Sequence, residues 1–410
     1  MTEITHKSGL KVFILKKDFD TAYAVFATRY GSYDNVFSVD GERVSVPNGI
    51  AHFLEHKLFE TEEGEDTFEL FAQVGADANA YTSTDRTAYL FSCTENFYKS
   101  LDILVKMVLT PVFTEENVSK EQGIIAQEIK MCEDRPTNIR YYNLMKALYG
   151  DDPVSIPIAG TVDSIARITP ELLYKCYGAF YRMSNMALCL SGRVETDKVL
   201  SILDKHLPAE KDSGVIHEGT PDTDKVYRSI IKANAEINTP LVSIGIKVPN
   251  ATGENSAVMD VMFEAVFGTC EDFYWDIYES EIVSSYSFYY SYSRAKSYFA
   301  LTGKSDDPDE LFRRVKEYIA RVKEEGITKD AFTRAQRKAY ASTVRGFDTA
   351  DDIAEDMLDS FLNGMDFFGS IEDLGRVTYE QVNELLKTVM DEDRVAMSVV
   401  YPNSDVAKGE

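Results

Sequence analysis

The chain has 410 residues, of which 44% are hydrophobic and 27% are charged. This is more than one hydrophobic core usually serves, so we expect at least two domains, and the composition excludes a disordered chain. The formal net charge of −25 argues against a nucleic-acid-binding protein, which would need a basic surface.

The sequence predicts neither a secretory signal peptide nor a membrane-spanning segment. Residues 1–18 contain no apolar segment of the kind that a secretory signal peptide carries, and no apolar run is long enough to span a bilayer. The cysteines are scattered and form no C-x-x-C pair; they are Cys93, Cys132, Cys176, Cys189 and Cys270. We therefore expect reduced thiols, a cytoplasmic location and no membrane partner.

The first predicted element that carries chemistry is a helix over residues 47–60, PNGIAHFLEHKLFE. Asn48 is its expected N-cap residue. Apolar residues recur at helical spacing along it, at Ile50, Phe53, Leu54 and Leu58.

His52 and His56 are four residues apart in this helix, so their imidazoles lie on one face, one turn apart. Two imidazoles so placed can share a metal ion, and zinc is the usual ion for nitrogen ligands completed by a carboxylate. Glu55 borders the same face and can accept a proton from a water that the metal activates. A chance H-x-x-E-H is expected only about 0.01 times in such a chain, which favours a metal site over two surface histidines in an amphipathic helix.

A catalytic zinc site needs a third protein ligand and one position open to water. The candidates lie in a second predicted helix, residues 119–134, where Glu121 and Glu128 are two turns apart and project from one face. Either glutamate could bind the metal while the other holds a ligand histidine by its free ring nitrogen, and both could equally be solvated charges. The apolar side of this helix is expected to consist of Ile124, Ile125 and Ile129.

The chain contains an internal repeat. Tyr298 in SYFALTG lies 209 residues after Tyr89 in TAYLFSC, and the segment that begins at Val377 lies 209 residues after a matching one that begins at Ile168. Two separate blocks with the same offset indicate duplication of a unit of roughly two hundred residues.

Each repeated unit is expected to run from strands to helices and to end in a late helix and a last strand. Thr169 and Pro170 should begin the late helix of the first unit, and MALCLSG and VAMSVVY should form the two last strands. Residues 208–224 are rich in Pro, Gly and charge, which is typical of a linker. We therefore predict a domain over residues 1–210, a linker over 211–224 and a second domain over 225–410.

The two units differ in their chemistry. All five histidines precede residue 220, and alignment of Thr114 with Thr328 places Glu121 over Ala335 and Glu128 over Ser342. The second unit therefore cannot hold the same zinc site. We expect it to supply structure and part of the substrate wall.

The second unit also contains an aromatic segment, SSYSFYYSYSR. Alternate residues would share one face of a strand, at Tyr286, Phe288, Tyr290 and Tyr292. This face is either an ordinary buried sheet face or part of a substrate-binding surface. Farther along, an exposed helix is predicted from an apolar stripe at Leu311, Val315, Ile319 and Val322.

H-x-x-E-H followed some seventy residues later by E-x-x-x-x-x-x-E resembles the inverzincin zinc peptidases of the pitrilysin and insulinase family. The resemblance covers the whole chain, PIAGTVDSI at residues 157–165 included, and is closest to short bacterial members related to mitochondrial processing peptidase. It implies that Glu128 is the third zinc ligand and Glu121 the supporting acid of the catalytic site.

The resemblance also implies where substrate binds. DANAYTS, residues 77–83, is similar to the family's substrate-binding edge strand, where a peptide would add as a strand at Asn79, Ala80 and Tyr81. Active members carry an arginine and, seven residues later, a tyrosine in the second unit. Here Tyr286 or Phe288 could stand for the tyrosine, whereas Tyr278 occupies the place of the arginine.

The implied fold is α+β, with two tandem homologous α/β-roll domains in a clam-like arrangement, each an antiparallel-rich sheet flanked by helices. The implied activity is that of a zinc-dependent endopeptidase for peptides or unfolded segments, with Zn²⁺ held by His52, His56 and Glu128 and with Glu55 as general base. Expected partners are a peptide substrate and a second such chain, in a homodimer or heterodimer. The alternatives are a non-catalytic or partner-dependent subunit, a peptidase dedicated to one precursor, and a non-peptidase zinc hydrolase.

Overall fold

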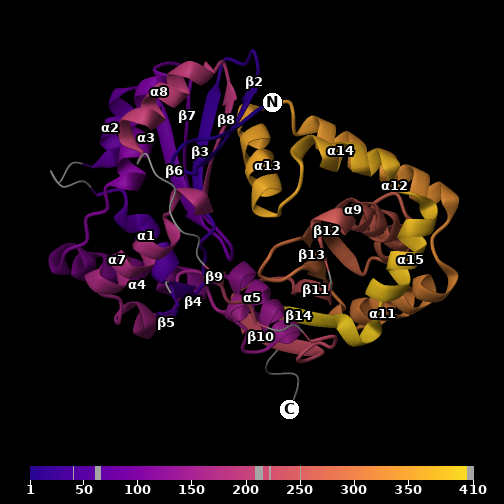
Figure 1. The fold of residues 1–410 in the computed structure, drawn as a ribbon. Coiled ribbons are helices and arrows are strands. Elements are labelled where there is room, and N and C mark those ends of the chain that lie inside the picture. Colours follow the sequence, from indigo (N-terminus) through magenta and orange to yellow (C-terminus); the bar gives the residue numbers. More distant parts are fainter. Residues whose placement is uncertain (40, 61–65, 208–215, 221–222, 250, 404–410) are drawn as a thin grey trace. The chain divides into compact units, whose positions relative to one another are not determined.

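The computed structural model describes the chain except residues 40, 61–65, 208–215, 221–222, 250 and 404–410. The chain folds into two compact units (Figure 1). Unit 1 contains residues 1–129, 157–219 and 345–367, and unit 2 contains residues 130–156, 220–344 and 368–410. Among the described residues no helix is long and apolar enough to cross a membrane.

Unit 1 is built on a six-stranded sheet with the order β1 (Thr2–Thr5), β2 (Lys11–Lys16), β8 (Met186–Gly192), β3 (Ala22–Thr28), β7 (Thr87–Cys93) and β6 (Ala76–Thr82). Neighbouring strands are antiparallel, except β2 and β8, which are parallel. β3 and β8 are buried along their whole length, so both faces of the sheet are covered there. β6 forms one edge of the sheet.

Helices on one face of this sheet enclose the main core of unit 1. They are α1 (Ile50–Lys57), α2 (Thr67–Gln73), α3 (Phe97–Leu109), α4 (Glu115–Glu133), α7 (Pro170–Phe180) and α8 (Thr196–His206). Short segments complete the unit: α6 (Val162–Ile165), the 3-10 turn η2 (Met183–Asn185) and a small antiparallel sheet of β5 (Glu42–Ser45), β4 (Val36–Val39) and β9 (Ile216–His217).

The other face of the unit 1 sheet is covered by a helix from far along the chain, α13 (Ala350–Leu362), which lies beside β8 and β3 in Figure 1. Its buried side chains include Ile353, Met357 and Leu358, and they pack against Val25 and Cys189 of the sheet. Unit 1 therefore needs a segment that the sequence assigns to the second repeat.

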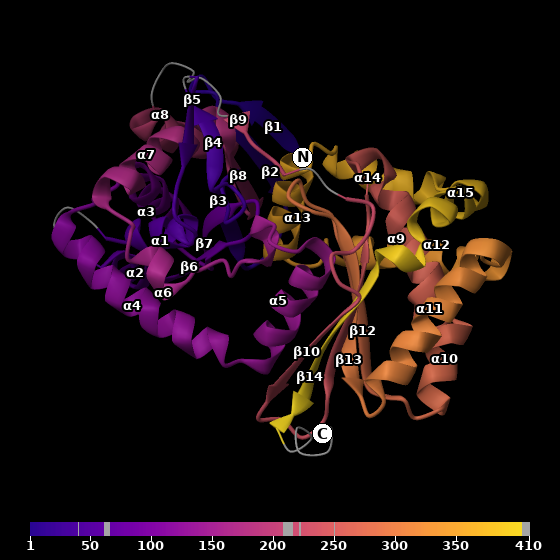
Figure 2. The same ribbon diagram turned by 90° about the horizontal axis from the view of Figure 1, so that it is seen from below.

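Unit 2 has a five-stranded sheet with the order β10 (Ile230–Ala235), β14 (Val395–Pro402), β11 (Leu241–Lys247), β13 (Tyr298–Ser305) and β12 (Val283–Ser291) (Figure 2). Its helices are α9 (Gly253–Phe267), α10 (Asp272–Glu279), α11 (Pro308–Glu325), α12 (Lys329–Arg345), α14 (Phe367–Arg376) and α15 (Tyr379–Val389), with the 3-10 turns η1 (Pro153–Ser155) and η3 (Glu392–Arg394). α5 (Pro136–Tyr149), from the first repeat, packs on β14, β11 and β10. α5 and α13 occupy equivalent places in the two repeats, and each packs on the sheet that is formed mainly by the other repeat. We call them the exchanged helices.

The duplication predicted from the sequence is visible in both sheets. The strand order β2-β8-β3-β7-β6 of unit 1 recurs as β10-β14-β11-β13-β12, with the parallel pair in the same place.

Two glutamines, Gln122 of α4 and Gln336 of α12, make equivalent hydrogen bonds in the two units. Each side-chain amide donates to three carbonyl oxygens before the next helix, those of Ile165, Ala166 and Ile168 in unit 1 and of Leu374, Gly375 and Val377 in unit 2. The α+β class is confirmed, with sheets flanked by helices.

Several predicted elements are confirmed. Thr169 caps α7, and the two last strands are β8 and β14. The stripe of α11 is buried at Leu311, Val315, Ile319 and Val322. The prediction that Ile124 lies on the apolar side of α4 is wrong: Ile124 is 47% exposed, because the buried face of α4 is centred on Ile125 and Ile129.

The described part of the predicted linker, residues 216–220 and 223–224, includes a short strand. Ile216 and His217 form β9, which pairs with β4 in unit 1, and the His217 Nδ1 lies 2.8 Å from the Asp34 Oδ1. Residues 211–215 and 221–222 lie outside the described residues.

Candidate metal centre

The helix that carries H-x-x-E-H is shorter than predicted and begins differently. α1 spans Ile50–Lys57, and its N-cap is Gly49 at φ 90°, so the prediction of Asn48 as the cap is wrong. A Cβ at position 49 would lie 2.4 Å from the carbonyl oxygen of Ala159, so this turn needs glycine for both its φ and its space. The Asn48 side chain instead accepts a hydrogen bond from Asn35 at 2.7 Å.

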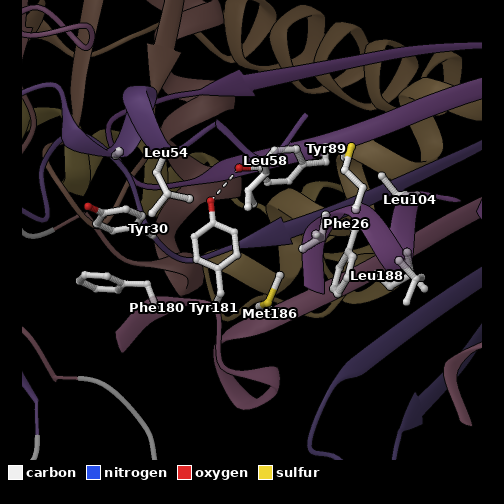
Figure 3. Close-up of a cluster of buried hydrophobic side chains, with 14 of the residues drawn as sticks. Phe26, Tyr30, Leu54, Leu58, Tyr89, Leu104, Phe180, Tyr181, Met186 and Leu188 are labelled. Carbon is white, nitrogen blue, oxygen red and sulfur yellow. Dashed lines mark hydrogen bonds between the residues drawn. The ribbon is translucent and has the colours of Figure 1, made fainter. Parts of the chain in front are cut away.

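The apolar face of α1 is seated in the core of unit 1. Its predicted apolar residues are all buried, at Ile50, Phe53, Leu54 and Leu58. Figure 3 shows Leu54 and Leu58 near Tyr89 and Tyr181, whose hydroxyl groups hydrogen-bond to each other at 2.8 Å. Because this face is buried, the rotation of α1 is fixed and the histidines are held on another side.

His52, His56 and Glu128 bring three potential ligand atoms within 4.8 Å of one another. The Nε2 atom of each histidine lies 3.7 Å from an oxygen of Glu128. These distances are too long for hydrogen bonds but are close to the roughly 3.4 Å that separates two ligands of one tetrahedral zinc ion. No other group of three such side chains occurs in the described part of the chain. The donor set therefore fits a zinc ion.

Glu121 occupies a different place from Glu128. Its Oε1 lies 3.0 Å from the Nδ1 of His56 and accepts the hydrogen bond, so in the neutral ring the proton sits on Nδ1 and the lone pair is on Nε2, toward Glu128. Burial acts to raise the pKa of Glu121, but the hydrogen bond with His56 and the nearby charge of Lys57 outweigh it and lower the pKa. Glu121 is thus placed to orient His56 as an ionised carboxylate.

The two histidines have opposite electrostatic surroundings. Burial, helped by repulsion from His56, lowers the pKa of His52 to about 3, so this ring is neutral and can present a lone pair. Its Nδ1 is buried without a hydrogen-bond partner among the described residues. Burial also acts to lower the pKa of His56, but the hydrogen bond with Glu121 and the surrounding carboxylates outweigh it and raise the pKa. A cation between the two Nε2 atoms would relieve this excess of negative charge.

Glu55 is almost buried, 8% exposed, beside the potential ligands. The Thr82 hydroxyl donates to its Oε2 at 2.6 Å. Burial raises the pKa of Glu55, although the bond from Thr82 and the charge of His56 oppose the shift. A carboxylate with a raised pKa is a better proton acceptor near neutral pH.

The predicted substrate strand is β6, and its end approaches this site. Ala80 packs against the main core, while the next residue, Tyr81, packs on the other face beside α13. The Ala80 amide donates to the Asn79 side-chain oxygen at 2.9 Å. β6 thus brings together the predicted peptide-pairing residues and Thr82, which holds Glu55.

Three of the four aromatic residues predicted to share a strand face in unit 2, Tyr286, Phe288 and Tyr290, pack against its core, whereas Tyr292 lies just after the end of β12. The Tyr286 hydroxyl donates to the Phe267 carbonyl at 2.8 Å, and the rings of Phe288 and Phe299 are 5.7 Å apart. Both side chains are partly buried against the core, as an ordinary sheet face would be. Tyr278 is exposed on α10. A role for Tyr286 or Phe288 in substrate binding stays a prediction.

Two residues of the site were not identified from the sequence. Thr82 holds Glu55, and its signal is the alternation of β6, which points it to the same side as Ala80. Lys57 is fully buried directly after His56, with its Nζ 2.6 Å from Glu60 and 3.9 Å from Glu121. A lysine between the buried Leu54 and Leu58 could have indicated a buried carboxylate partner.

The comparisons with known proteins agree with this geometry. Residues 44–162 match the family model described as insulinase (peptidase family M16), and residues 167–339 match the model described as the peptidase M16 inactive domain. The chain belongs to peptidase family M16. The resemblance inferred from the sequence is thereby confirmed, and the match to the inactive-domain model begins after the three potential metal ligands His52, His56 and Glu128.

M16 relatives match over nearly the whole chain. "Uncharacterized zinc protease YmfH" of Bacillus subtilis is 35% identical, with 97% of this chain and 95% of the relative covered. An M16-like peptidase of Alicyclobacillus acidocaldarius is 34% identical, with a TM-score of 0.94 and 98% of both chains covered. A protease of Helicobacter pylori, 18% identical with a TM-score of 0.82 over 98% of this chain and 99% of its own, shows the same fold. The curated M16 relatives are thus named zinc proteases.

Proposed function

We propose that this chain is a zinc-dependent endopeptidase that cleaves peptides or unfolded segments. The observation that carries the proposal is the convergence of His52 and His56 of α1 with Glu128 of α4, whose potential ligand atoms lie within 4.8 Å of one another beside the buried Glu55. The relatives named zinc proteases support the same metal and the same class of reaction.

In this proposal His52 and His56 bind the metal through their Nε2 atoms and Glu128 binds it through its carboxylate. When bound by these residues, zinc would supply a Lewis acid that lowers the pKa of a water and polarises the scissile carbonyl. Glu121 fixes the ring of His56 through Nδ1. Against the effect of burial, the hydrogen bond with His56, helped by the charge of Lys57, lowers the pKa of Glu121 and favours its ionised form.

Glu55 is the general base and then the general acid. It removes a proton from the attacking water, and it delivers that proton to the nitrogen of the leaving amine. Its raised pKa suits both steps, because the carboxylate accepts a proton more readily and the carboxylic acid still releases it. Thr82 keeps the Oε2 of Glu55 in place, which leaves the Oε1 for the water.

Substrate binds in this proposal by adding a strand to the edge of the unit 1 sheet. β6 ends the sheet, and its residues Asn79, Ala80 and Tyr81 would pair with the peptide backbone. Backbone pairing depends little on sequence, so we expect broad recognition of extended segments.

Location and partners are part of the proposal. All five cysteines are free thiols, which supports a reducing compartment such as the cytoplasm. Residues 275–285, WDIYESEIVSS, contain no arginine where active relatives are expected to carry one. This departure favours a second candidate, a subunit that needs a homologous partner chain before it cleaves.

The test is cleavage of a mixed peptide library by the purified, zinc-loaded chain, read by mass spectrometry, with Glu55→Gln as the matched control. Glutamine keeps the shape of Glu55 and leaves the metal ligands intact. Cuts by the native chain that the variant does not make would support the proposal and reveal the bond preference. Equal cutting by both proteins would exclude Glu55 as the base, and no cutting by either would favour the partner-dependent candidate.

A further inference from the structure

One half-buried carboxylate on α13, that of Glu355, receives hydrogen bonds from two strands of the unit 1 sheet. The Tyr81 hydroxyl donates to the Glu355 Oε2 at 2.7 Å, and the Tyr23 hydroxyl donates to the Glu355 Oε1 at 2.8 Å. Tyr23 lies in β3, inside the sheet, whereas Tyr81 lies in β6, at its edge. The same carboxylate therefore links a firmly held strand to the strand that is paired on one side.

Two consecutive residues of β6 are held from opposite faces of the sheet. Tyr81 points to Glu355, and Thr82 points to the general base Glu55, at 2.6 Å. Neighbouring side chains of a strand point to opposite faces, so a shift that frees Tyr81 also moves Thr82. An edge strand has a hydrogen-bonded neighbour on one side alone, so side-chain anchors matter more to its position than they do for β3.

The turn after β6 is anchored to the same helix. Arg86 makes an ion pair with Asp359, one turn beyond Glu355, and lies 3.1 Å from Asp85. Helix α13 therefore holds both the end of β6 and the turn that leads into β7. Unit 2 has no carboxylate at the matching position: the alignment that pairs Gln122 with Gln336 places Tyr141 of α5 where Glu355 stands.

We infer that Glu355 is a positioning residue for the metal centre, acting through Tyr81. It holds β6 at the position in which the edge accepts a peptide and in which Thr82 reaches Glu55. The inference rests on the proposed function for its catalytic consequence. Through α13, the second repeat would thus position residues beside the potential metal site, although it contributes none of the potential ligands.

A matched pair of variants separates this role from simple stabilisation. Tyr81→Phe and Tyr23→Phe each remove one phenol oxygen that is bonded to the same carboxylate, the first from the edge strand and the second from an inner strand. We expect Tyr81→Phe to raise the KM for peptides roughly five-fold, with a smaller change in kcat. Without the bond to Glu355, part of the peptide's binding free energy would be spent on fixing the position of β6. Tyr23→Phe should leave the KM unchanged, and Glu355→Ala should raise it at least as much as Tyr81→Phe.

Hydrogen–deuterium exchange gives a readout that does not depend on activity. Exchange across residues 76–82 should be faster in Tyr81→Phe and Glu355→Ala than in the native chain and in Tyr23→Phe, while zinc content stays the same in all four proteins. Equal effects of the two phenylalanine variants, or no effect of Tyr81→Phe, would overturn the inference. If the native chain cleaves no peptide, the proposed endopeptidase fails, and the exchange comparison still decides the positioning role.

Discussion

Helix α1 of unit 1, which carries the two histidines of the potential metal site, has a counterpart in unit 2 that contains no histidine. At the repeat offset of 209 residues, Val261 and Ala265 of α9 replace the two histidines, whereas Glu264 matches Glu55. The two glutamates differ in their partners. Glu55 is held by the neutral hydroxyl of Thr82, and Glu264 makes a 2.6 Å ion pair with Lys338.

This difference concerns how the charge of a glutamate at this helix position is stabilised. A largely buried carboxylate is unfavourable unless a charge or hydrogen bonds compensate it. In unit 2 the ion pair with Lys338 balances the charge of Glu264. In unit 1 the Glu55 carboxylate has only a hydroxyl as its partner, its pKa is raised by burial, and it lies beside three side chains that fit a metal, as the proposed proton-transfer role requires.

The largest expected effect comes from removing α13, the helix of the second repeat that packs in unit 1. Residues 1–219 alone lack α13, so the sheet face that contacts Ile353, Met357 and Leu358 would be exposed. Each of these side chains contributes about 1.5–3 kcal/mol by its burial, and together they approach the stability of a typical domain. We expect this fragment to show no cooperative unfolding in circular dichroism and to bind no zinc.

Co-expression of the fragment with residues 220–410 is the control, because it restores α13. A fragment 1–219 that folds alone and binds one zinc ion would show that the exchanged helix is dispensable.

The next largest effect comes from the ligands. His56→Ala and Glu128→Gln should each abolish zinc binding under dialysis. Peptide cleavage should fall at least a thousand-fold, since the metal that would activate the water is no longer held. The measurement is zinc per chain by elemental mass spectrometry. Glu264→Gln, in the corresponding helix of unit 2, should keep zinc at the native level, and zinc loss there would break the distinction between the units.

Removal of the hydroxyl that holds Glu55 has a smaller effect. Thr82→Val keeps the shape of the side chain but leaves the Oε2 of Glu55 without its 2.6 Å donor. We expect kcat to fall about ten-fold with little change in KM or zinc content. Thr82→Ser is the matched control and should retain most of the activity. A change in KM alone would place Thr82 in peptide binding instead.

The smallest effect concerns the ion pair of unit 2. Lys338→Met leaves Glu264 without its cation, and because Lys338 is 40% exposed we expect a loss of only about 1 kcal/mol in the free energy of unfolding. Urea unfolding measures it. Adding Glu264→Gln should restore the stability, and neither change should affect zinc content. A drop in zinc content would mean that this pair has a role beyond its own unit.

Much of this architecture could be predicted from the sequence because it is encoded locally. The spacing of His52 and His56 fixes one helical face, and the two blocks at an offset of 209 residues reveal the duplication. The last strands and the capping of α7 by Thr169 follow from residue types in short windows.

The remaining features depend on contacts between distant parts of the chain. The start of α1 is set by the carbonyl of Ala159, which leaves room for Gly49 but for no Cβ. The exchange of α5 and α13 is invisible to periodicity, since both helices present an apolar face that could cover either sheet. The anchoring of Tyr81 by Glu355 joins residues 274 positions apart, and no spacing in the sequence predicts it.

The measurement that tests the central claim most directly is a crystal structure of the zinc-loaded chain with anomalous data collected on both sides of the zinc absorption edge. One anomalous peak should lie between the Nε2 atoms of His52 and His56 and the carboxylate of Glu128, with no second peak at Glu264. A zinc peak at any other place, with those three side chains free of metal, would contradict the account.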